Sequence, residues 1–145
     1  MTNKTKLSFM KNIILLFCLA LSLSFVGCDN PEKARDAMDE GINQMYNYGN
    51  NTKAEACFTE ALQYEKNNYE AYYYRGCTKF NRGKYKEAVA DFEKVLELKP
   101  NHPDAYFALG RISFISSDVD MACYYYKLAD QYGRPNMEDF LKICH

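Results

Sequence analysis

The sequence lacks most of the residues and motifs that catalysis requires. Its 145 residues include no Trp, only 4 Pro and only 2 His. No phosphate-binding loop, dinucleotide-binding glycine pattern, serine-nucleophile pattern or zinc-protease motif is present, so no catalytic residue, metal site or cofactor is expected. His102 and His145 have no partner at catalytic spacing, and we expect both imidazoles to lie on the solvated surface. These absences argue against an enzyme.

A basic face is also missing. The formal net charge is −1, but Lys4, Lys6 and Lys11 precede an apolar run and all 19 acidic residues follow it. The part after that run therefore has 15 basic residues against 19 acidic ones. Because nucleic-acid binding depends on a basic surface that displaces counterions, no nucleic-acid partner is expected.

The N-terminal segment, up to Cys28, has the pattern of a secretory signal peptide. Three lysines precede an apolar run that extends from Ile13 to Val26. This run is shorter than the roughly 20 apolar residues that a membrane-spanning helix needs. It fits the apolar part of a signal peptide, which needs roughly 7–15. The length therefore predicts a targeting segment rather than a spanning helix.

The end of this run resembles the lipobox of bacterial lipoproteins. It reads Phe25-Val26-Gly27-Cys28, with Phe25 where the usual lipobox has Leu. The resemblance implies cleavage after Gly27 and attachment of fatty acyl chains such as palmitate to Cys28, and two or more chains make membrane attachment stable. It also implies a location at the bacterial cell envelope, with the mature domain in the periplasm or at the cell surface. An ordinary signal peptide and an uncleaved anchor are the alternatives.

A repeating pattern organises the remaining chain. Four sets of residues recur at one constant spacing: Ala54, Ala88 and Ala122; Phe58, Phe92 and Tyr126; Ala61, Val95 and Ala129; Met38, Tyr72 and Tyr106. Each unit divides into two amphipathic segments of about 14 residues around a turn, at residues 48–52, 81–84 and 116–118. Helices of this length are marginal alone, so the pattern predicts helix pairs that stabilise one another by stacking.

The middle unit, residues 69–102, resembles a tetratricopeptide repeat almost throughout. The matching positions are Tyr72 at the fourth, Gly76 at the eighth, Tyr85 at the seventeenth, Ala88 at the twentieth, Phe92 at the twenty-fourth and Pro100 at the thirty-second. The resemblance implies an all-α fold, namely a short α-solenoid of three helix-turn-helix repeats followed by a C-terminal capping helix.

The resemblance also implies the organisation of the chain. The expected parts are a signal peptide at 1–27, a lipid-anchored linker at 28–34, repeats at 35–68, 69–102 and 103–136, and a capping helix at 137–145 with Phe140, Leu141 and Cys144 facing inward. The first repeat is degenerate, because Ile42 replaces the glycine expected where the two helices meet.

The cysteines of the mature part are open to two interpretations. Cys18 and Cys28 belong to the signal peptide and the lipobox, which leaves Cys57, Cys77, Cys123 and Cys144. No pair has the C-x-x-C spacing of metal and redox sites. A capping helix would pack against the helix that carries Cys123, which favours a Cys123–Cys144 disulfide. Buried free thiols that act as small apolar side chains are the alternative.

The first helix of each repeat lines the concave surface in proteins of the tetratricopeptide repeat family. Positions 2, 5, 9 and 12 of the repeat fall on one helical stripe. The resemblance therefore implies a partner-binding groove lined by Asp39, Asn43, Tyr46, Tyr73, Cys77, Phe80, Phe107, Arg111 and Phe114, with Asp36, Glu70 and Asp104 along one edge.

This groove has an aromatic centre, and exposed aromatic clusters usually mark a binding surface. The favoured function is a membrane-anchored scaffold that binds a protein or peptide partner. A carbohydrate-binding envelope lipoprotein that uses the Tyr and Phe rings as stacking platforms is the alternative, and burial of the same rings in the core is another. Only Asn43 and Arg111 match the Lys/Asn/Arg clamp with which chaperone-binding members hold a peptide carboxylate, so no such clamp is expected.

Overall fold

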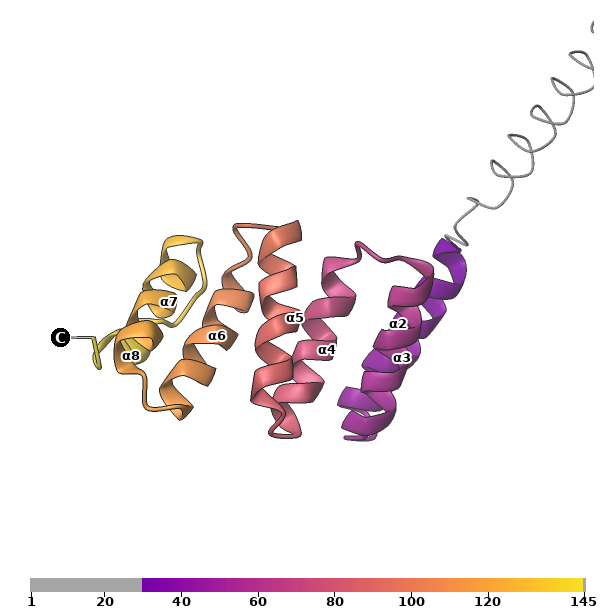
Figure 1. The fold of residues 1–145 in the computed structure, drawn as a ribbon, viewed down its shortest axis with the longest axis horizontal. Coiled ribbons are helices and arrows are strands. Elements are labelled where there is room, and N and C mark those ends of the chain that lie inside the picture. The colour runs from indigo at the N-terminus through magenta and orange to yellow at the C-terminus, as the bar shows by residue number, and fades with distance from the viewer. Residues whose placement is uncertain (1–29, 145) are drawn as a thin grey trace, which may run out of the picture.

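A computed structural model describes residues 30–144, so the predicted signal peptide, Cys28 and His145 lie outside the described residues. This part of the chain is all-helical, as predicted. Its helices are α2 (Pro31–Tyr46), α3 (Asn51–Tyr64), α4 (Tyr69–Asn81), α5 (Tyr85–Leu98), α6 (Pro103–Ile115), α7 (Val119–Gln131) and the short α8 (Glu138–Leu141). They form the pairs α2–α3, α4–α5 and α6–α7, which lie side by side along the long axis of the molecule (Figure 1).

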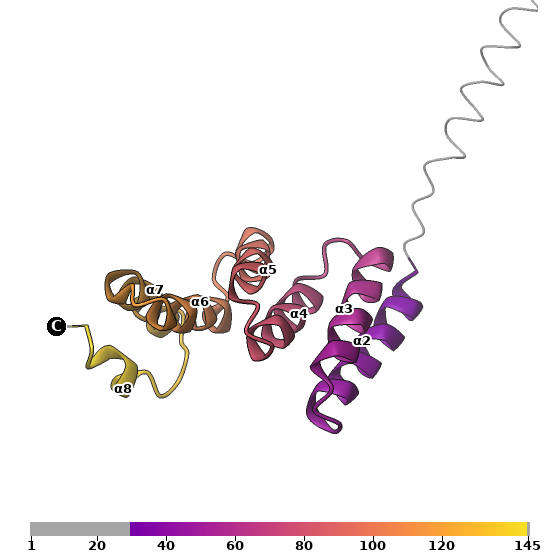
Figure 2. The ribbon, with the colours of Figure 1, turned by 60° about the horizontal axis from the view of Figure 1, so that its bottom comes forward.

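The successive pairs build a short solenoid, with α8 beside the last pair (Figure 2). The predicted helix-turn-helix architecture is therefore confirmed. Between residues 30 and 144, no helix is long and apolar enough to cross a membrane.

Side-chain caps fix where most of these helices begin. In five of the seven helices, a side chain directly before the helix accepts a hydrogen bond from the backbone N–H three residues further on. Such caps satisfy backbone donors that have no partner within the helix. The capping residues are Asn30, Asn50, Asn68, His102 and Asp118.

A glycine in the first helix of each pair lies against an aromatic ring from the second helix. A Cβ atom added at Gly76 would lie only 2.8 Å from Cε1 of Phe92, closer than packed carbon atoms approach. Phe92 is fully buried, so its ring has little room to move away. The three contacts of this kind are Gly41–Phe58, Gly76–Phe92 and Gly110–Tyr126.

The first pair contains one residue more than the others, which corrects the expectation that Ile42 stands at the helix contact. Gly41 makes that contact, and it lies one residue further from Gly76 than Gly76 lies from Gly110. The turn positions nevertheless keep the constant spacing of the repeat, and all three have positive φ: Gly49 (63°), Gly83 (73°) and Ser117 (64°). The extra residue therefore lies between Gly41 and Gly49, and the face of α2 is rotated by one residue from its predicted register.

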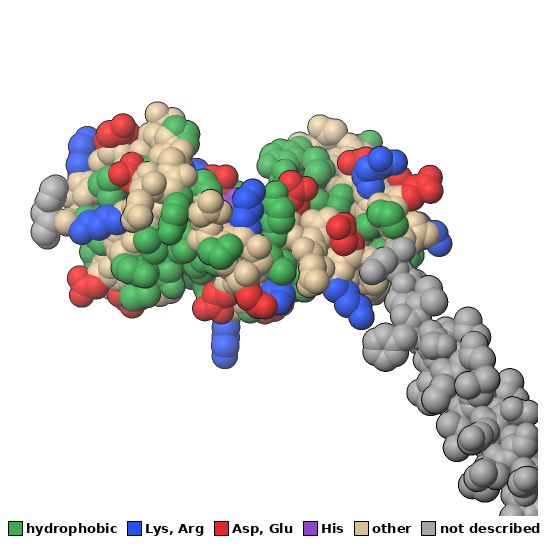
Figure 3. Space-filling view, turned by 90° about the horizontal axis from the view of Figure 1, so that it is seen from above, with side chains coloured by type: hydrophobic (Ala, Val, Ile, Leu, Met, Phe, Trp, Pro, Cys, Tyr) green, Lys and Arg blue, Asp and Glu red, His purple; other side chains and the backbone are tan. Residues whose placement is uncertain are grey.

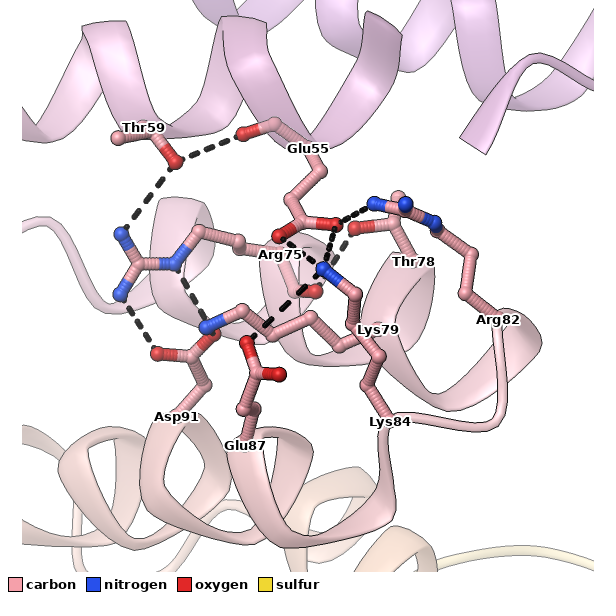
Figure 4. Close-up of polar contacts among 9 residues, drawn as sticks. All are labelled: Glu55, Thr59, Arg75, Thr78, Lys79, Arg82, Lys84, Glu87 and Asp91. Atoms are coloured by element: carbon pink, nitrogen blue, oxygen red, sulfur yellow. Dashed lines mark hydrogen bonds and ion pairs between the residues drawn. The ribbon is translucent and has the colours of Figure 1, made fainter. Parts of the chain in front are cut away.

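A polar network joins the first two pairs (Figure 4). Asp91 of α5 is only 3% exposed and accepts hydrogen bonds from Arg75 Nε at 2.9 Å, Arg75 Nη2 at 2.6 Å and Lys79 Nζ at 2.7 Å. Glu55 of α3 forms ion pairs with Arg82 and Lys84, which flank the α4–α5 turn. The Asp91 contacts tie α4 to α5, and the Glu55 contacts tie the first pair to the second.

The C-terminal segment differs in part from the predicted capping helix. Helix α8 covers only Glu138–Leu141, not the whole of 137–145. After α7 the chain turns at Gly133, and Met137 is buried against the third pair. The helix ends early because the last residues turn back to α7, where Cys144 forms a disulfide with Cys123 across a Cα–Cα distance of 5.3 Å.

Candidate binding groove

Five of the predicted groove residues come together between α4 and α6. They line a hollow of about 140 Å³, here called the central hollow. These are Tyr73, Cys77 and Phe80 from α4 and Phe107 and Arg111 from α6. The lining is completed by Asn81, Phe92, Ala108, Arg134 and the predicted edge residue Asp104. The five predicted residues are spaced three or four apart within each helix, so each set lies on one helical face.

The aromatic rings of this hollow are half-buried rather than fully buried. The ring of Tyr73 lies 6.0 Å from that of Phe92 in the core, and the ring of Phe80 packs edge-on against Tyr85 at 5.4 Å. The rings therefore contribute to packing within the second pair and still present a face to the hollow. The rings are therefore neither fully buried core residues nor a fully exposed stripe.

Burial favours the neutral forms of two side chains that line the central hollow. It raises the pKa of the Tyr73 phenol well above its usual range. Burial also raises the pKa of the Cys77 thiol to about 11, so this thiol stays protonated at neutral pH. A protonated thiol is a poor nucleophile, which makes Cys77 a small apolar wall residue rather than a reactive one.

Two guanidinium groups lie over the aromatic rings at the edge of the hollow. Arg111 lies 4.5 Å from the ring centroid of Phe80 and 6.0 Å from that of Phe107. Arg134 lies 3.7 Å from the centroid of Phe107 and forms an ion pair with Asp104. Cations over ring faces are attracted by the ring quadrupole, so both arginines are held close to the groove.

Arg134 was missed by the sequence reasoning. It lies three residues after the end of α7 and belongs to no helical stripe, so neither the repeat period nor the position rules indicate it. The chain brings it to the groove because it turns back at Gly133, where φ is 89°.

Three other predicted groove residues lie away from the central hollow. Asp39 is exposed and lines a separate hollow with Glu70. The side chain of Asn43 accepts a hydrogen bond from Asn47 at 2.6 Å, and Tyr46 is 70% exposed. The structure thus separates these residues from the five that it brings together.

The inserted residue in the first pair explains this difference. Once it is allowed for, Tyr73, Cys77 and Phe80 correspond to Met38, Ile42 and Met45, which pack in or against the core of the first pair. Met38 and Ile42 also line the hollow that contains Asp39. Alignment of Gly41 with Gly76 would have revealed the shift from the sequence alone.

Phe114, the ninth predicted groove residue, lies at a second hollow. This hollow of about 270 Å³, here called the terminal hollow, is lined by Arg111, Phe114 and Ile115 of α6 together with Tyr126, Asp139, Phe140 and Ile143. Phe114 is 49% exposed. In the space-filling view, hydrophobic side chains are exposed over much of the half of the molecule away from the grey trace (Figure 3).

His102 is not a solvated surface residue, which corrects the expectation from sequence. Its Nδ1 accepts a hydrogen bond from the N–H of Ala105 at 3.2 Å and thereby caps α6. Its ring stacks on Tyr73 with the centroids 5.1 Å apart. Burial, followed by the charge of Lys99, lowers the pKa of His102, so the neutral imidazole that the cap requires is favoured.

The remaining cysteines and acidic residues offer no further site in the described part of the chain. Cys57 and Cys77 are free thiols, whereas Cys123 and Cys144 form the disulfide. Within residues 30–144, no group of three or more His, Cys, Asp or Glu side chains is placed to hold a metal ion.

Known proteins share this architecture. Residues 69–102 match the sequence model of the tetratricopeptide repeat family, whereas no curated protein matches the chain. The first tetratricopeptide domain of Spaghetti (RPAP3), bound to the HSP90 peptide SRMEEVD, is similar in structure, with a TM-score of 0.74 at 21% identity over 81% of this chain and 94% of that one.

Two further solved structures are similar. The Yersinia enterocolitica type III secretion chaperone SycD, in complex with a peptide of the translocator YopD, has a TM-score of 0.72 at 13% identity over 78% of this chain and 92% of that one. The Sgt2 tetratricopeptide domain from Aspergillus fumigatus has a TM-score of 0.70 at 22% identity over 81% of this chain and 79% of that one. The chain therefore has the fold of a tetratricopeptide-repeat solenoid, and its residues 69–102 form a tetratricopeptide repeat.

Proposed function

We propose that this chain is a non-catalytic scaffold that binds a peptide segment of a partner protein across α4 and α6. The observation that carries the proposal is the central hollow, where aromatic rings, a neutral thiol and Arg111 face solvent from two adjacent helices. Rings that are held by packing on one side and open on the other suit binding, because little side-chain freedom is lost when a partner covers them.

The similar solved structures support this proposal. Two of them are bound to peptides, one from HSP90 and one from YopD. A helical solenoid offers a partner segment side-chain pockets rather than a free strand edge, so recognition depends on the side chains that line the surface. In this chain those side chains belong to the second and third pairs.

We further propose that Cys28 anchors the scaffold in a bacterial membrane. The lipobox-like segment before it supports this, and so does the start of α2 at Pro31, only three residues later in the sequence. A folded domain so close to an acylated cysteine would lie at the membrane surface. Cys28→Ser should abolish membrane partitioning and leave the precursor uncleaved, as measured by detergent partitioning and intact mass. A Ser variant that still partitions with detergent and has the shorter mass would refute the anchor.

Site-specific photo-crosslinking in the producing cell tests the scaffold function. With p-benzoylphenylalanine in place of Phe114, we expect a defined protein adduct after irradiation, because this side chain lies half-exposed beside the groove. The same replacement of Tyr48, which is 70% exposed and lies in the α2–α3 turn outside both hollows, is the matched control and should give no such adduct. Equal adducts from both positions, or none from position 114, would contradict peptide binding here.

A further inference from the structure

The central and terminal hollows share one residue. Arg111 lines both, with the central hollow on its α4 side and the terminal hollow on its α7 side. A partner segment that crosses α6 would therefore meet a small hollow of aromatic rings edged by the Asp104–Arg134 ion pair, then the cation of Arg111, then a mostly apolar hollow.

The terminal hollow is mostly apolar and is built by two parts of the chain. Helix α6 contributes Phe114 and Ile115, and the C-terminal segment contributes Phe140 and Ile143. The ring of Phe140 packs edge-on against Phe107, with the centroids 4.8 Å apart. This wall of the hollow therefore rests directly on a residue of the central hollow.

The charge of Arg111 is free to meet a partner. Among residues 30–144, no carboxylate lies within ion-pair distance of its guanidinium group. The two nearby carboxylates are engaged elsewhere, because Asp104 pairs with Arg134 and Asp139 pairs with Lys142 at 2.6 Å. A guanidinium group over a ring keeps its N–H donors available at its edge, where a carboxylate can accept two of them.

From this arrangement we infer the chemistry of the partner: an extended peptide segment in which an acidic residue stands between two large apolar side chains. The apolar side chains enter the two hollows, and the carboxylate accepts hydrogen bonds from Arg111. The inference rests on the proposed scaffold function and specifies which segment that scaffold selects. It requires an internal acidic side chain and does not depend on a peptide terminus.

The disulfide contributes to this selectivity. Phe140 and Ile143 lie on the C-terminal segment, in which α8 is a helix of only 4 residues. Cys144 links the end of that segment to Cys123 of α7. Helices this short are not stable alone. Met137 and Phe140 also hold this segment against the third pair, so loss of the disulfide should loosen the terminal hollow at Ile143 more than it disturbs the central hollow.

A displayed library of random peptides, selected on the full-length protein in detergent, tests the inference. We expect the enriched peptides to carry Asp or Glu between two large apolar residues. Selection on Arg111→Gln should lose the acidic preference and keep the apolar ones, and the affinity of an enriched peptide should fall about tenfold or more, as for a hydrogen bond to a charged group. Lys86→Gln, which removes an exposed cation from α5, is the matched control and should change neither.

Selection on Cys144→Ser should keep the acidic preference and relax one of the two apolar preferences. Enriched peptides without an acidic residue, or an acidic preference that survives Arg111→Gln, would overturn this inference and leave the scaffold function standing. Enrichment no greater on the native protein than on the double variant Tyr73→Ala with Phe107→Ala would overturn both. Comparison of these selections therefore distinguishes the two failures.

Discussion

Replacement of Asp91 by Asn should destabilise the fold more than any other single charge removal in the polar network. The Asp91 carboxylate is almost completely buried and forms ion pairs with Arg75 and Lys79. Asn preserves the shape but removes the negative charge, so two mostly buried cations lose their counterion. Breaking a buried pair in this way costs about 3–5 kcal/mol. Because Asn still accepts a hydrogen bond, we expect a loss near the lower limit, about 3 kcal/mol.

Urea unfolding followed by helical circular dichroism measures this loss. With a slope of about 1–3 kcal/mol per molar urea, a loss of about 3 kcal/mol lowers the midpoint by at least about 1 M. The control is Glu55→Gln, because the Glu55 side chain is 17% exposed against 5% for Asp91, and its partners Arg82 and Lys84 are 30% and 34% exposed. Exposed pairs contribute only about 0–1 kcal/mol.

Equal midpoints for Asp91→Asn and Glu55→Gln would refute the assignment of a buried charge network. A second variant separates charge from packing. Asp91→Leu combined with Arg75→Met and Lys79→Met replaces the ions with apolar side chains and should recover much of the loss, because buried ions of this kind can be exchanged for packed apolar residues without net cost.

Three further outcomes are expected. Ala88→Leu should lower the melting temperature by several degrees, because a larger side chain at this fully buried position overpacks the helix contact at a cost of about 1–3 kcal/mol; an unchanged melt would contradict the observed pairing. The free energy of unfolding should fall as the pH drops below the unfolded-state pKa of His, about 6.5, because His102 must stay neutral to accept the hydrogen bond from Ala105 N–H. His102→Asn keeps a capping side chain and should remove this pH dependence. Reduction by a dithiol should lower stability by about 3 kcal/mol, since the Cys123–Cys144 disulfide closes a loop with a sequence separation of 21; Cys144→Ser should melt at the reduced value with or without the dithiol.

The repeat period was sufficient to predict the fold because it reflects packing within and between pairs. Positions such as Ala88 and Phe92 lie where the two helices of a pair touch. The first of these positions needs a small side chain and the second needs an aromatic ring. Such positions tolerate little change in volume, so the pattern stays visible in the sequence. The same constraint brought Tyr73 and Phe107 into one hollow, since each occupies the same position in neighbouring repeats.

The first repeat shows where periodicity misleads. Positions counted with the constant period of the later repeats placed Asp39, Asn43 and Tyr46 in the groove, but one additional residue before Gly49 rotates the face of α2. A single residue turns a helix by about 100° at 3.6 residues per turn. The turn and the second helix of the first pair keep the constant spacing of the repeat. The shift is therefore visible only at Gly41, the glycine that packs against an aromatic ring.

His102 and Arg134 show a different limit. The surroundings of these two side chains are set by contacts between distant segments, and the local sequence pattern does not predict such contacts. An imidazole before a Pro-initiated helix can point to solvent or cap the helix, and the choice depends on Tyr73 from the preceding pair. Arg134 reaches Phe107 only because the chain reverses after α7.

The rotated face of α2 has a consequence for how far from its anchor the molecule can hold a partner. The side chains that correspond to Tyr73, Cys77 and Phe80 in the first pair, namely Met38, Ile42 and Met45, include no aromatic ring, and the hollow beside Met38 and Ile42 is lined by charged residues such as Asp39 and Glu70. On the proposal that Cys28 is acylated, this pair, which contributes to neither the central nor the terminal hollow, follows the anchor directly and acts as a spacer. Both hollows then lie in the distal pairs, so a bound segment is separated from the acylated cysteine by one helix pair.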